Sequence, residues 1–234
     1  MREQEIRADD MTVFTVHPDG EGPFPVAVLF MDAPGYREEL KAHARRYAAA
    51  GYYAVLPDLF HRAGEKLTID AEGRERIFEL VRSLTPEMVD EDTRVALDAV
   101  AHDLAASPGP KVCVGYCMGA RFAVHTAAAM AEEFAAASGA HPGALATDEP
   151  DSPHLELPQV RGELYIAFAE HDRTATPESV DRFRDAMADA GVRGEVERLP
   201  GTEHGFAMAD RDIYDRHAAD RHFERTLDLW RRNL

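Results

Sequence analysis

Cysteine is scarce in this sequence: Cys113 and Cys117 are the two cysteines among 234 residues. Two cysteines cannot supply a disulfide framework, and no histidine or further cysteine stands near them at the spacing of a zinc site. We therefore expect both side chains to be reduced thiols.

Long apolar runs are missing as well. No segment approaches the roughly 18 consecutive apolar residues that a membrane helix needs. The first residues, Met1 to Glu5, lack the apolar stretch of a secretory signal peptide. These absences predict a cytoplasmic protein with no membrane attachment.

Positive charge is also in short supply. The sequence has 26 lysine and arginine residues against 43 aspartate and glutamate residues, which gives a formal net charge of -17 at pH 7. A surface this acidic repels the phosphate backbone of nucleic acids and anionic membranes. It also slows the capture of anionic small molecules unless the pocket carries local positive charge. We therefore expect a small-molecule substrate and no nucleic-acid partner.

Internal repeats, low-complexity tracts and interdomain linkers are absent too. The apolar share of 45% and the charged share of 29% are ordinary for a soluble globular protein. A chain of 234 residues is long enough to bury a sizeable core. We expect one domain spanning residues 1–234, present as a monomer or a small homo-oligomer.

What the sequence does contain is a regular alternation of apolar patterns. Continuous apolar runs predict buried strands, and apolar residues three or four positions apart predict helices between them. The alternation predicts an α/β fold with a mostly parallel central sheet and helices on both faces. Strands are expected at 25–31, 52–56, 111–114, 134–140, 164–169 and 194–199, and helices around 40–48, 77–84, 97–104, 118–130, 176–187 and 223–230.

The longest irregular segment covers residues 141–159 and is rich in proline and acidic residues. It is too polar for a core element and too long for a simple connection. Two interpretations remain open, which are a lid or pocket wall and a solvated surface loop.

The pentapeptide Gly115-Tyr116-Cys117-Met118-Gly119 lies where a buried strand meets an alanine-rich helix. It matches the pattern of a nucleophile elbow, with cysteine in the place of serine. A nucleophile on a strained strand-to-helix turn leaves little room beside it, so the flanking glycines let the backbone close around it. The start of the helix carries partial positive charge, which favours the thiolate. The pattern therefore predicts Cys117 as a nucleophile.

In this template an acid and then a histidine follow the nucleophile, each at the carboxyl end of a later strand. Asp172 follows the strand 164–169, and His204 follows the strand 194–199. An isolated aspartate is more often a turn former, and an isolated histidine is more often a surface or packing residue. The joint pattern and its order nevertheless favour a catalytic role for both.

Two further residues compete for roles in such a site. His171 is a rival base, but it shares a turn with Asp172 and would leave that carboxylate without a histidine to orient. Cys113 precedes Cys117 by four residues within the predicted strand. It is expected to be a small buried hydrophobe rather than a ligand.

Five groups of residues carry a resemblance to a known family. The groups are Met31-Asp32-Ala33-Pro34-Gly35; Ala50-Gly51-Tyr52 with Leu56-Pro57-Asp58-Leu59-Phe60; Gly115-Tyr116-Cys117-Met118-Gly119; Glu170-His171-Asp172; and His204-Gly205-Phe206. Together they resemble the dienelactone hydrolase family, and the resemblance covers nearly the whole chain. It implies an α/β-hydrolase fold and the hydrolysis of cyclic or unsaturated lactone esters, without a metal or an organic cofactor.

The resemblance also implies roles for single residues. It implies a catalytic triad of Cys117, His204 and Asp172. It further implies an oxyanion hole formed by the backbone N–H groups of Met118 and Ala33.

Two positions depart from the family pattern. The family's acidic residue that restrains the resting thiol is usually glutamate, and the matching Asp32 is one methylene shorter. A family arginine that grips the substrate carboxylate is matched by Met208, which cannot do so. Arg74 and Arg76 are candidates for the family's other arginine, with a solvated helix charge as the competing interpretation. The residues expected to bind substrate or restrain the thiol are Asp32, Arg74, Arg76 and Phe206.

Two classes of function remain open. The first is a cysteine-dependent, carboxymethylenebutenolidase-like hydrolase of carboxylic esters or lactones, with a general carboxylesterase or thioesterase as its variant. Because Met208 removes one carboxylate clamp and the surface is acidic, a neutral ester or lactone is expected to serve as well as a dicarboxylate-like dienelactone. The second class is a non-catalytic binding protein, since a fold alone does not guarantee activity.

Overall fold

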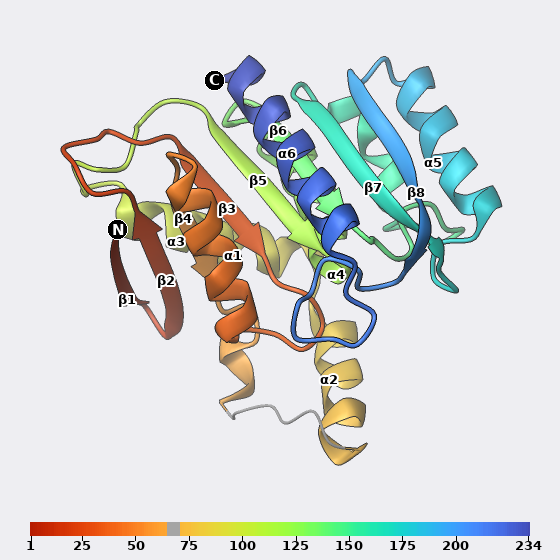
Figure 1. The fold of residues 1–234 in the computed structure, drawn as a ribbon, viewed down its shortest axis with the longest axis horizontal. Helices are drawn as coiled ribbons and strands as arrows, with labels where there is room; N and C mark the ends of the chain where they lie inside the picture. Colours follow the sequence, from red (N-terminus) through yellow and green to blue (C-terminus); the bar gives the residue numbers. More distant parts are fainter. Residues whose placement is uncertain (65–70) are drawn as a thin grey trace. The chain divides into compact units, whose positions relative to one another are not determined.

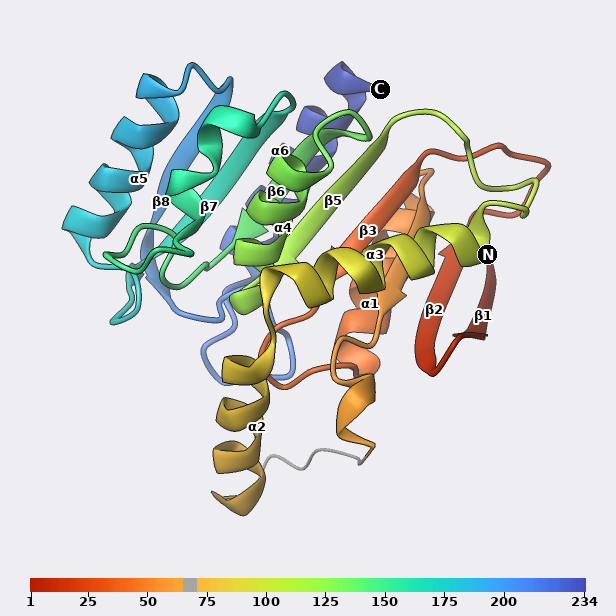
Figure 2. The same cartoon turned by 180° about the vertical axis from the view of Figure 1, so that it is seen from behind.

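The computed structural model describes residues 1–64 and 71–234, apart from the side chains of Ala71, Glu72 and Arg74. The chain divides into two compact units, Met1–Pro110 and Lys111–Leu234. Figures 1 and 2 show the strands and helices of each unit from opposite sides. The expectation of one domain over residues 1–234 stays a prediction.

The described part of the first unit is built on four strands in the order β1, β2, β4, β3. β1 (Arg2–Ala8) and β2 (Met11–His17) form an antiparallel hairpin, and β2 pairs antiparallel with β4 (Tyr53–Pro57). β3 (Val26–Phe30) pairs with β4 in parallel. Both β3 and β4 are buried along their full length, as their unbroken apolar sequences predict.

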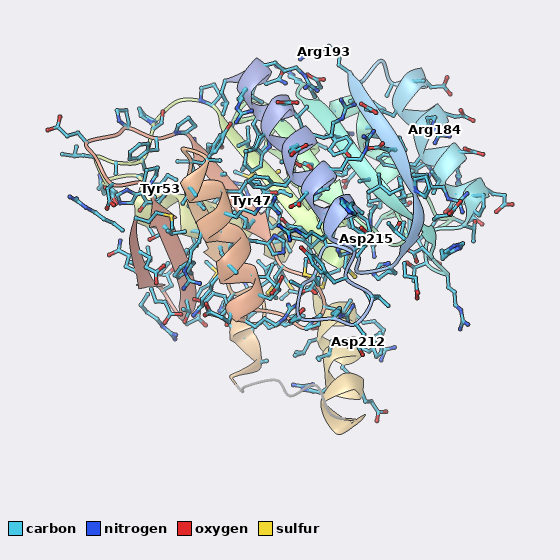
Figure 3. The ribbon with its side chains drawn as sticks, viewed as in Figure 1. Tyr47, Tyr53, Arg184, Arg193, Asp212 and Asp215 are labelled. Carbon is cyan, nitrogen blue, oxygen red and sulfur yellow. The ribbon has the colours of Figure 1, made fainter. Side chains whose placement is uncertain are left out.

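Helices cover both faces of this first sheet. α1 and α3 lie on opposite sides of it (Figures 1 and 2). Tyr47 of α1 and Tyr53 of β4, labelled in Figure 3, have no exposed surface. The helices of the described part are α1 (Glu38–Ala49), α2 (Ala71–Ser83), α3 (Pro86–Val100) and the short 3-10 helix η1 (His61–Ala63).

Two features of the first unit differ from the sequence-based expectation. No strand is predicted before residue 25, but the structure has β1 and β2 there. β1 is mostly charged and exposed and is stabilised by its pairing with β2, which is mostly buried. The predicted helix around 97–104 ends at Val100, and Leu104 is 90% exposed instead of buried. Asp103 turns the chain there, because its carboxylate accepts hydrogen bonds from the Ala105 N–H and the Tyr53 hydroxyl, each at 2.9 Å.

The second unit contains four parallel strands in the order β5, β6, β7, β8. Their arrowheads point the same way in Figure 1, so their carboxyl ends meet at one edge of this sheet. The strand predicted at 134–140 has these bounds in the structure, whereas the last two strands run beyond their predicted ends. The bounds are β5 (Lys111–Tyr116), β6 (Phe134–Ala140), β7 (Glu163–His171) and β8 (Gly194–Glu203).

Helices also cover both faces of the second sheet. α4 packs on β5 and β6, and α6 packs on β6 and β7 from the opposite side (Figures 1 and 2). Asp215, labelled in Figure 3, caps α6 by accepting the Ala218 N–H at 3.0 Å. The helices are α4 (Met118–Ala129), α5 (Pro177–Asp189), α6 (Arg216–Asn233) and the short 3-10 helices η2 (Pro153–Leu155) and η3 (Leu157–Gln159).

The predicted sheet class is confirmed. Parallel pairing joins β3 to β4, and it joins β5 through β8. Among the residues that the structure describes, antiparallel pairs involve β1 and β2. No helix in these same residues is both long enough and apolar enough to cross a membrane.

The irregular segment 141–159 packs against helices of its own unit. Its two 3-10 helices contact α4, and η2 also contacts α5. Ser152 and Leu157 have no exposed surface. The Ser152 hydroxyl oxygen accepts the Thr147 N–H at 2.9 Å and lies 2.8 Å from His154 Nδ1. These contacts hold the segment against its own unit, while residues 148–151 are exposed, so both interpretations stay open.

Candidate active site

Cys117 stands on a sharp turn between β5 and α4. Its backbone has φ 54° and ψ -115°, in the left-handed half of conformational space that a non-glycine residue rarely adopts. A Cβ atom added to Gly115 would overlap the carbonyl group of Gly119, so only glycine fits two residues before the cysteine. The turn therefore has the strained, tightly closed geometry that the pentapeptide predicts.

Backbone contacts hold this turn in place. The Cys117 N–H donates to the carbonyl oxygen of Ala140 at the end of β6, at 3.0 Å. Met118 is the first residue of α4, and N–H groups in the first turn of a helix have no acceptor within that helix. The side chain of Cys117 thus lies beside a helix N-terminus, where partial positive charge favours an anion.

His204 and Asp172 meet Cys117 at the carboxyl edge of the second sheet. His204 Nε2 lies 3.0 Å from Cys117 Sγ. On the other side of the ring, Nδ1 lies 2.6 Å from Asp172 Oδ2, and the Asp172 side chain is only 1% exposed. The three side chains that the sequence singles out are therefore in direct contact, in the order sulfur, imidazole, carboxylate.

Thr174, which the sequence analysis does not single out, completes the surroundings of Asp172. Its backbone N–H and its hydroxyl donate to Asp172 Oδ1 at 2.8 and 2.6 Å. These bonds leave Oδ2 to the histidine. An acceptor carboxylate two residues before a donating N–H is the spacing of an Asx turn, so the signal for Thr174 was present in the sequence.

The contacts set the charges of the pair. Burial alone would lower the pKa of His204, but hydrogen bonds to Asp172 and Cys117 outweigh burial and raise the pKa to about 10. Burial alone would raise the pKa of Asp172, but hydrogen bonds from His204 and Thr174 outweigh it and lower the pKa. At neutral pH the imidazole is therefore positively charged. Its Nε2–H can therefore donate to Cys117 Sγ, 3.0 Å away.

The structure also places His171 and Cys113, the two rivals for a role in the site. His171 has a 66% exposed side chain, 3.8 Å from the carboxylate of Glu170. Cys113 has no exposed surface, its sulfur lies 3.7 Å from the carbonyl oxygen of Ala123, and burial raises the pKa of its thiol. A buried neutral thiol is a poor nucleophile.

Asp32, expected to restrain the thiol, and Ala33, expected in the oxyanion hole, follow β3 in the first unit. Asp32 is buried and paired with Arg37, whose two terminal nitrogens each contact one carboxylate oxygen, one of them at 3.1 Å. Arg37, five residues away, was not predicted from the sequence. Contacts of Asp32 and Ala33 with Cys117 stay predictions.

The remaining expected residues have other surroundings. Arg76 on α2 is exposed and donates to Glu79 at 2.9 Å, as a solvated helix charge would. The side chain of Arg74 lies outside the described residues. Phe206 and Met208 have no exposed surface.

Two features of the described residues bear on other sites. No group of three or more histidine, cysteine, aspartate or glutamate side chains is arranged to hold a metal ion. A hollow of the first unit, lined by Arg2, His17 and Asp103 among others, contains none of the predicted site residues.

Known proteins of similar sequence include two that are named as carboxymethylenebutenolidases. A "Putative carboxymethylenebutenolidase" of Yersinia pestis is 27% identical over 228 residues, covering 95% of this chain and 84% of that protein. The "Carboxymethylenebutenolidase" of Rhodococcus opacus is 27% identical over 210 residues, covering 88% of this chain and 81% of that protein.

Solved structures share the fold. A crystal structure of a dienelactone hydrolase from Klebsiella pneumoniae, described there as putative, has a TM-score of 0.87 at 21% identity and covers 98% of this chain and 97% of its own. The predicted α/β-hydrolase fold is thereby confirmed. The model of the dienelactone hydrolase family matches residues 11–234. The chain therefore belongs to the dienelactone hydrolase family and is a hydrolase.

Proposed function

We propose that this protein hydrolyses carboxylic ester or lactone bonds with Cys117 as the nucleophile, His204 as the proton carrier and Asp172 as the residue that orients the histidine. One observation carries the proposal. Cys117 Sγ lies 3.0 Å from His204 Nε2, while His204 Nδ1 lies 2.6 Å from Asp172 Oδ2. Nucleophile, base and orienting acid in one line are the arrangement that acyl transfer requires.

Acylation begins from the thiolate and the imidazolium. The sulfur of Cys117 attacks the carbonyl carbon, and the carbonyl oxygen becomes an oxyanion, for which the N–H groups of Met118 and Ala33 are the proposed donors. When the bond to the alcohol oxygen breaks, His204 gives its Nε2 proton to that oxygen. The products of this step are a thioester on Cys117 and the free alcohol, which stays attached to the acyl group in the case of a lactone.

Deacylation uses the histidine in the opposite direction. Neutral His204 takes a proton from a water molecule, and the resulting hydroxide attacks the thioester carbonyl. The carbon–sulfur bond breaks, the carboxylic acid leaves, and the thiolate and the imidazolium are restored. Asp172 keeps the ring in the tautomer and the orientation that both steps need.

The substrate is proposed to be a small ester or lactone. The names of the relatives from Yersinia pestis and Rhodococcus opacus support a lactone. The formal net charge of -17 and the apolar Met208 support a neutral substrate as much as a dicarboxylate-like one. A general carboxylesterase or thioesterase would use the same three residues, so a panel of lactones, esters and thioesters separates these possibilities.

The test compares two cysteine variants. Cys117→Ala should abolish hydrolysis of p-nitrophenyl acetate and of simple lactones, whereas the control Cys113→Ala should keep it, because Cys113 has no exposed surface and its sulfur contacts the carbonyl oxygen of Ala123. Circular dichroism checks that both variants fold. Undiminished hydrolysis by Cys117→Ala would remove the nucleophile and with it the proposal.

A non-catalytic binding protein makes a different prediction. Iodoacetamide should alkylate Cys117 faster than a free thiol of ordinary pKa, because the neighbouring imidazolium and helix N-terminus favour the thiolate. Cys113 should stay unmodified in the folded protein. A binding protein need show neither the fast alkylation nor any turnover on the substrate panel.

A further inference from the structure

A second histidine, His141, is buried beside His204. Its side chain is 1% exposed, and the centres of the two rings are 5.4 Å apart with their planes inclined by 65°. Phe206 and Tyr116 surround the same ring, with centres at 5.2 and 6.2 Å from that of His141. His141 is thus the middle member of a ring cluster, Tyr116, His141 and Phe206, packed behind the proposed proton carrier.

The hydrogen-bond partners of His204 do not prevent rotation of its ring about the line through Nδ1 and Nε2. Asp172 contacts Nδ1 and Cys117 contacts Nε2, so two points of the ring are fixed. A ring fixed at two points can still rock about the line that joins them. A third contact away from that line stops the rocking, and the edge-to-face contact with His141 is such a contact.

The backbone places His141 and the nucleophile on one rigid support. His141 follows the last residue of β6 with φ 39°, a left-handed conformation that is rare outside glycine. Its N–H donates to the carbonyl oxygen of Ala167 on β7 at 2.8 Å. The carbonyl oxygen of the preceding residue, Ala140, accepts the N–H of Cys117 at 3.0 Å. The distance between the sulfur and the ring cluster is therefore set by the end of a buried strand.

The His141 ring contacts its neighbours by packing and not by hydrogen bonds. Among the residues that the structure describes, no protein group hydrogen-bonds to either of its ring nitrogens. Burial, and next the positive charge of His204, hold the pKa of His141 well below its ordinary value. The ring therefore stays uncharged at neutral pH and does not repel the imidazolium beside it.

We propose that His141 is a positioning residue, which fixes the tilt of the His204 ring through packing and so keeps Nε2 directed at the sulfur and at the leaving group. This inference rests on the proposed function. Within the described residues the His141 ring makes no hydrogen bond to the sulfur or the carboxylate, and its effect passes through His204. A small misdirection of a proton carrier reduces the rate of the chemical step more than it reduces substrate binding.

The test compares variants of two buried histidines with wild type and with Cys117→Ala, using p-nitrophenyl acetate. His141→Leu removes the ring at similar volume, and His141→Phe restores an aromatic contact. The matched control is His222→Leu, because His222 on α6 also packs on Tyr116, and it is bound to Ser138 at 3.1 Å. Melting temperature, kcat and KM are measured for each.

His141→Leu should lower kcat by about 10-fold or more with little change in KM, and its melting temperature should not fall, because no protein hydrogen bond is lost. His141→Phe should recover part of kcat. His222→Leu should melt at a lower temperature and keep kcat. If His141→Leu does not fold, His141→Met takes its place with the same outcomes.

Two results would overturn the inference: a wild-type kcat in folded His141→Leu, or a phenylalanine variant no more active than the leucine variant. Either result leaves the proposed function standing as long as Cys117→Ala is inactive. An active Cys117→Ala overturns the proposed function instead, so the two failures are distinguishable.

Discussion

Thr174 donates two hydrogen bonds to a single oxygen of Asp172: its backbone N–H and its hydroxyl lie 2.8 and 2.6 Å from Oδ1. The carboxylate therefore cannot rotate freely, and its other oxygen is directed at His204. Gly143 leaves room for the Thr174 side chain, since a Cβ at residue 143 would lie 2.6 Å from the Thr174 hydroxyl oxygen. Thr174 thus helps to orient His204 by holding the carboxylate of Asp172.

The first prediction follows from this relationship. Thr174→Val keeps the shape of the side chain and removes the hydroxyl donor, so Asp172 retains one hydrogen bond to Oδ1 and gains rotational freedom. We expect a fall in kcat of about 10-fold, the loss of one charge-assisted hydrogen bond. Steady-state kinetics on p-nitrophenyl acetate measure it. Thr174→Ser, which keeps the hydroxyl, is the control, and equal kcat in the two variants would count against the role given to the hydroxyl.

Asp172→Asn should be far more damaging than Thr174→Val. The amide is neutral and can donate to Nδ1, which favours the wrong tautomer of His204 and removes the charge that stabilises the imidazolium. We expect kcat to fall by about 1,000-fold or more, with the fold retained in circular dichroism. Activity within a few fold of wild type would show that His204 does not depend on this carboxylate.

The stability of the protein should depend on pH through His204. Its pKa of about 10 in the folded protein lies above the ordinary value of 6.5. A raised pKa contributes stability that is fully present below about 6.5 and is lost as pH rises through about 10. The difference in free energy of unfolding between wild type and His204→Gln, measured with urea, should therefore shrink from pH 7 to pH 10.5. A difference that stays constant over this range contradicts the raised pKa.

Asp172 should act at the other end of the pH scale. Its pKa is lowered, so its contribution to stability is present above the ordinary value of 3.8 and is lost as pH falls through the lower folded value. Wild type and Asp172→Asn should therefore converge in free energy of unfolding as the solution is acidified below pH 4. Divergence on acidification would have the wrong sign for this carboxylate.

Gly115→Ala tests the turn itself. The added Cβ would overlap the backbone of Gly119, which cannot move without unwinding the start of α4. We expect a loss of about 3 kcal/mol or more in the free energy of unfolding, measured by urea titration. Gly191→Ala is the control, because its Cβ would meet nothing within 4 Å and only its φ of 69° opposes the change, at about 1 to 2 kcal/mol. Equal losses in both variants would remove the steric argument.

The sequence predicted that Cys117, Asp172 and His204 lie together, because their signals are local. Cys117 is marked by its flanking glycines, and Asp172 and His204 are marked by their order and by the ends of buried strands. The antiparallel hairpin β1–β2 carries no such signal in β1, which is mostly exposed and charged and gains its structure from a partner strand.

His141 was missed for a different reason. It also follows a predicted strand, so its position was available from the sequence. Its role depends on a left-handed backbone and on contacts between ring edges and faces, which no spacing rule describes. Thr174 was missed even though its spacing from Asp172 is that of a common turn, because a lone threonine in a loop matches many structural roles.

The most direct measurement of the central claim is the identification of the acylated residue. Wild-type protein is mixed with p-nitrophenyl acetate, quenched in acid during turnover, digested and analysed by mass spectrometry. We expect an acetyl group on the peptide that contains Cys117, bound to its sulfur, and none on Cys113. Hydrolysis by the wild type combined with an acetyl group on any other residue, or with none on Cys117, contradicts Cys117 as the nucleophile.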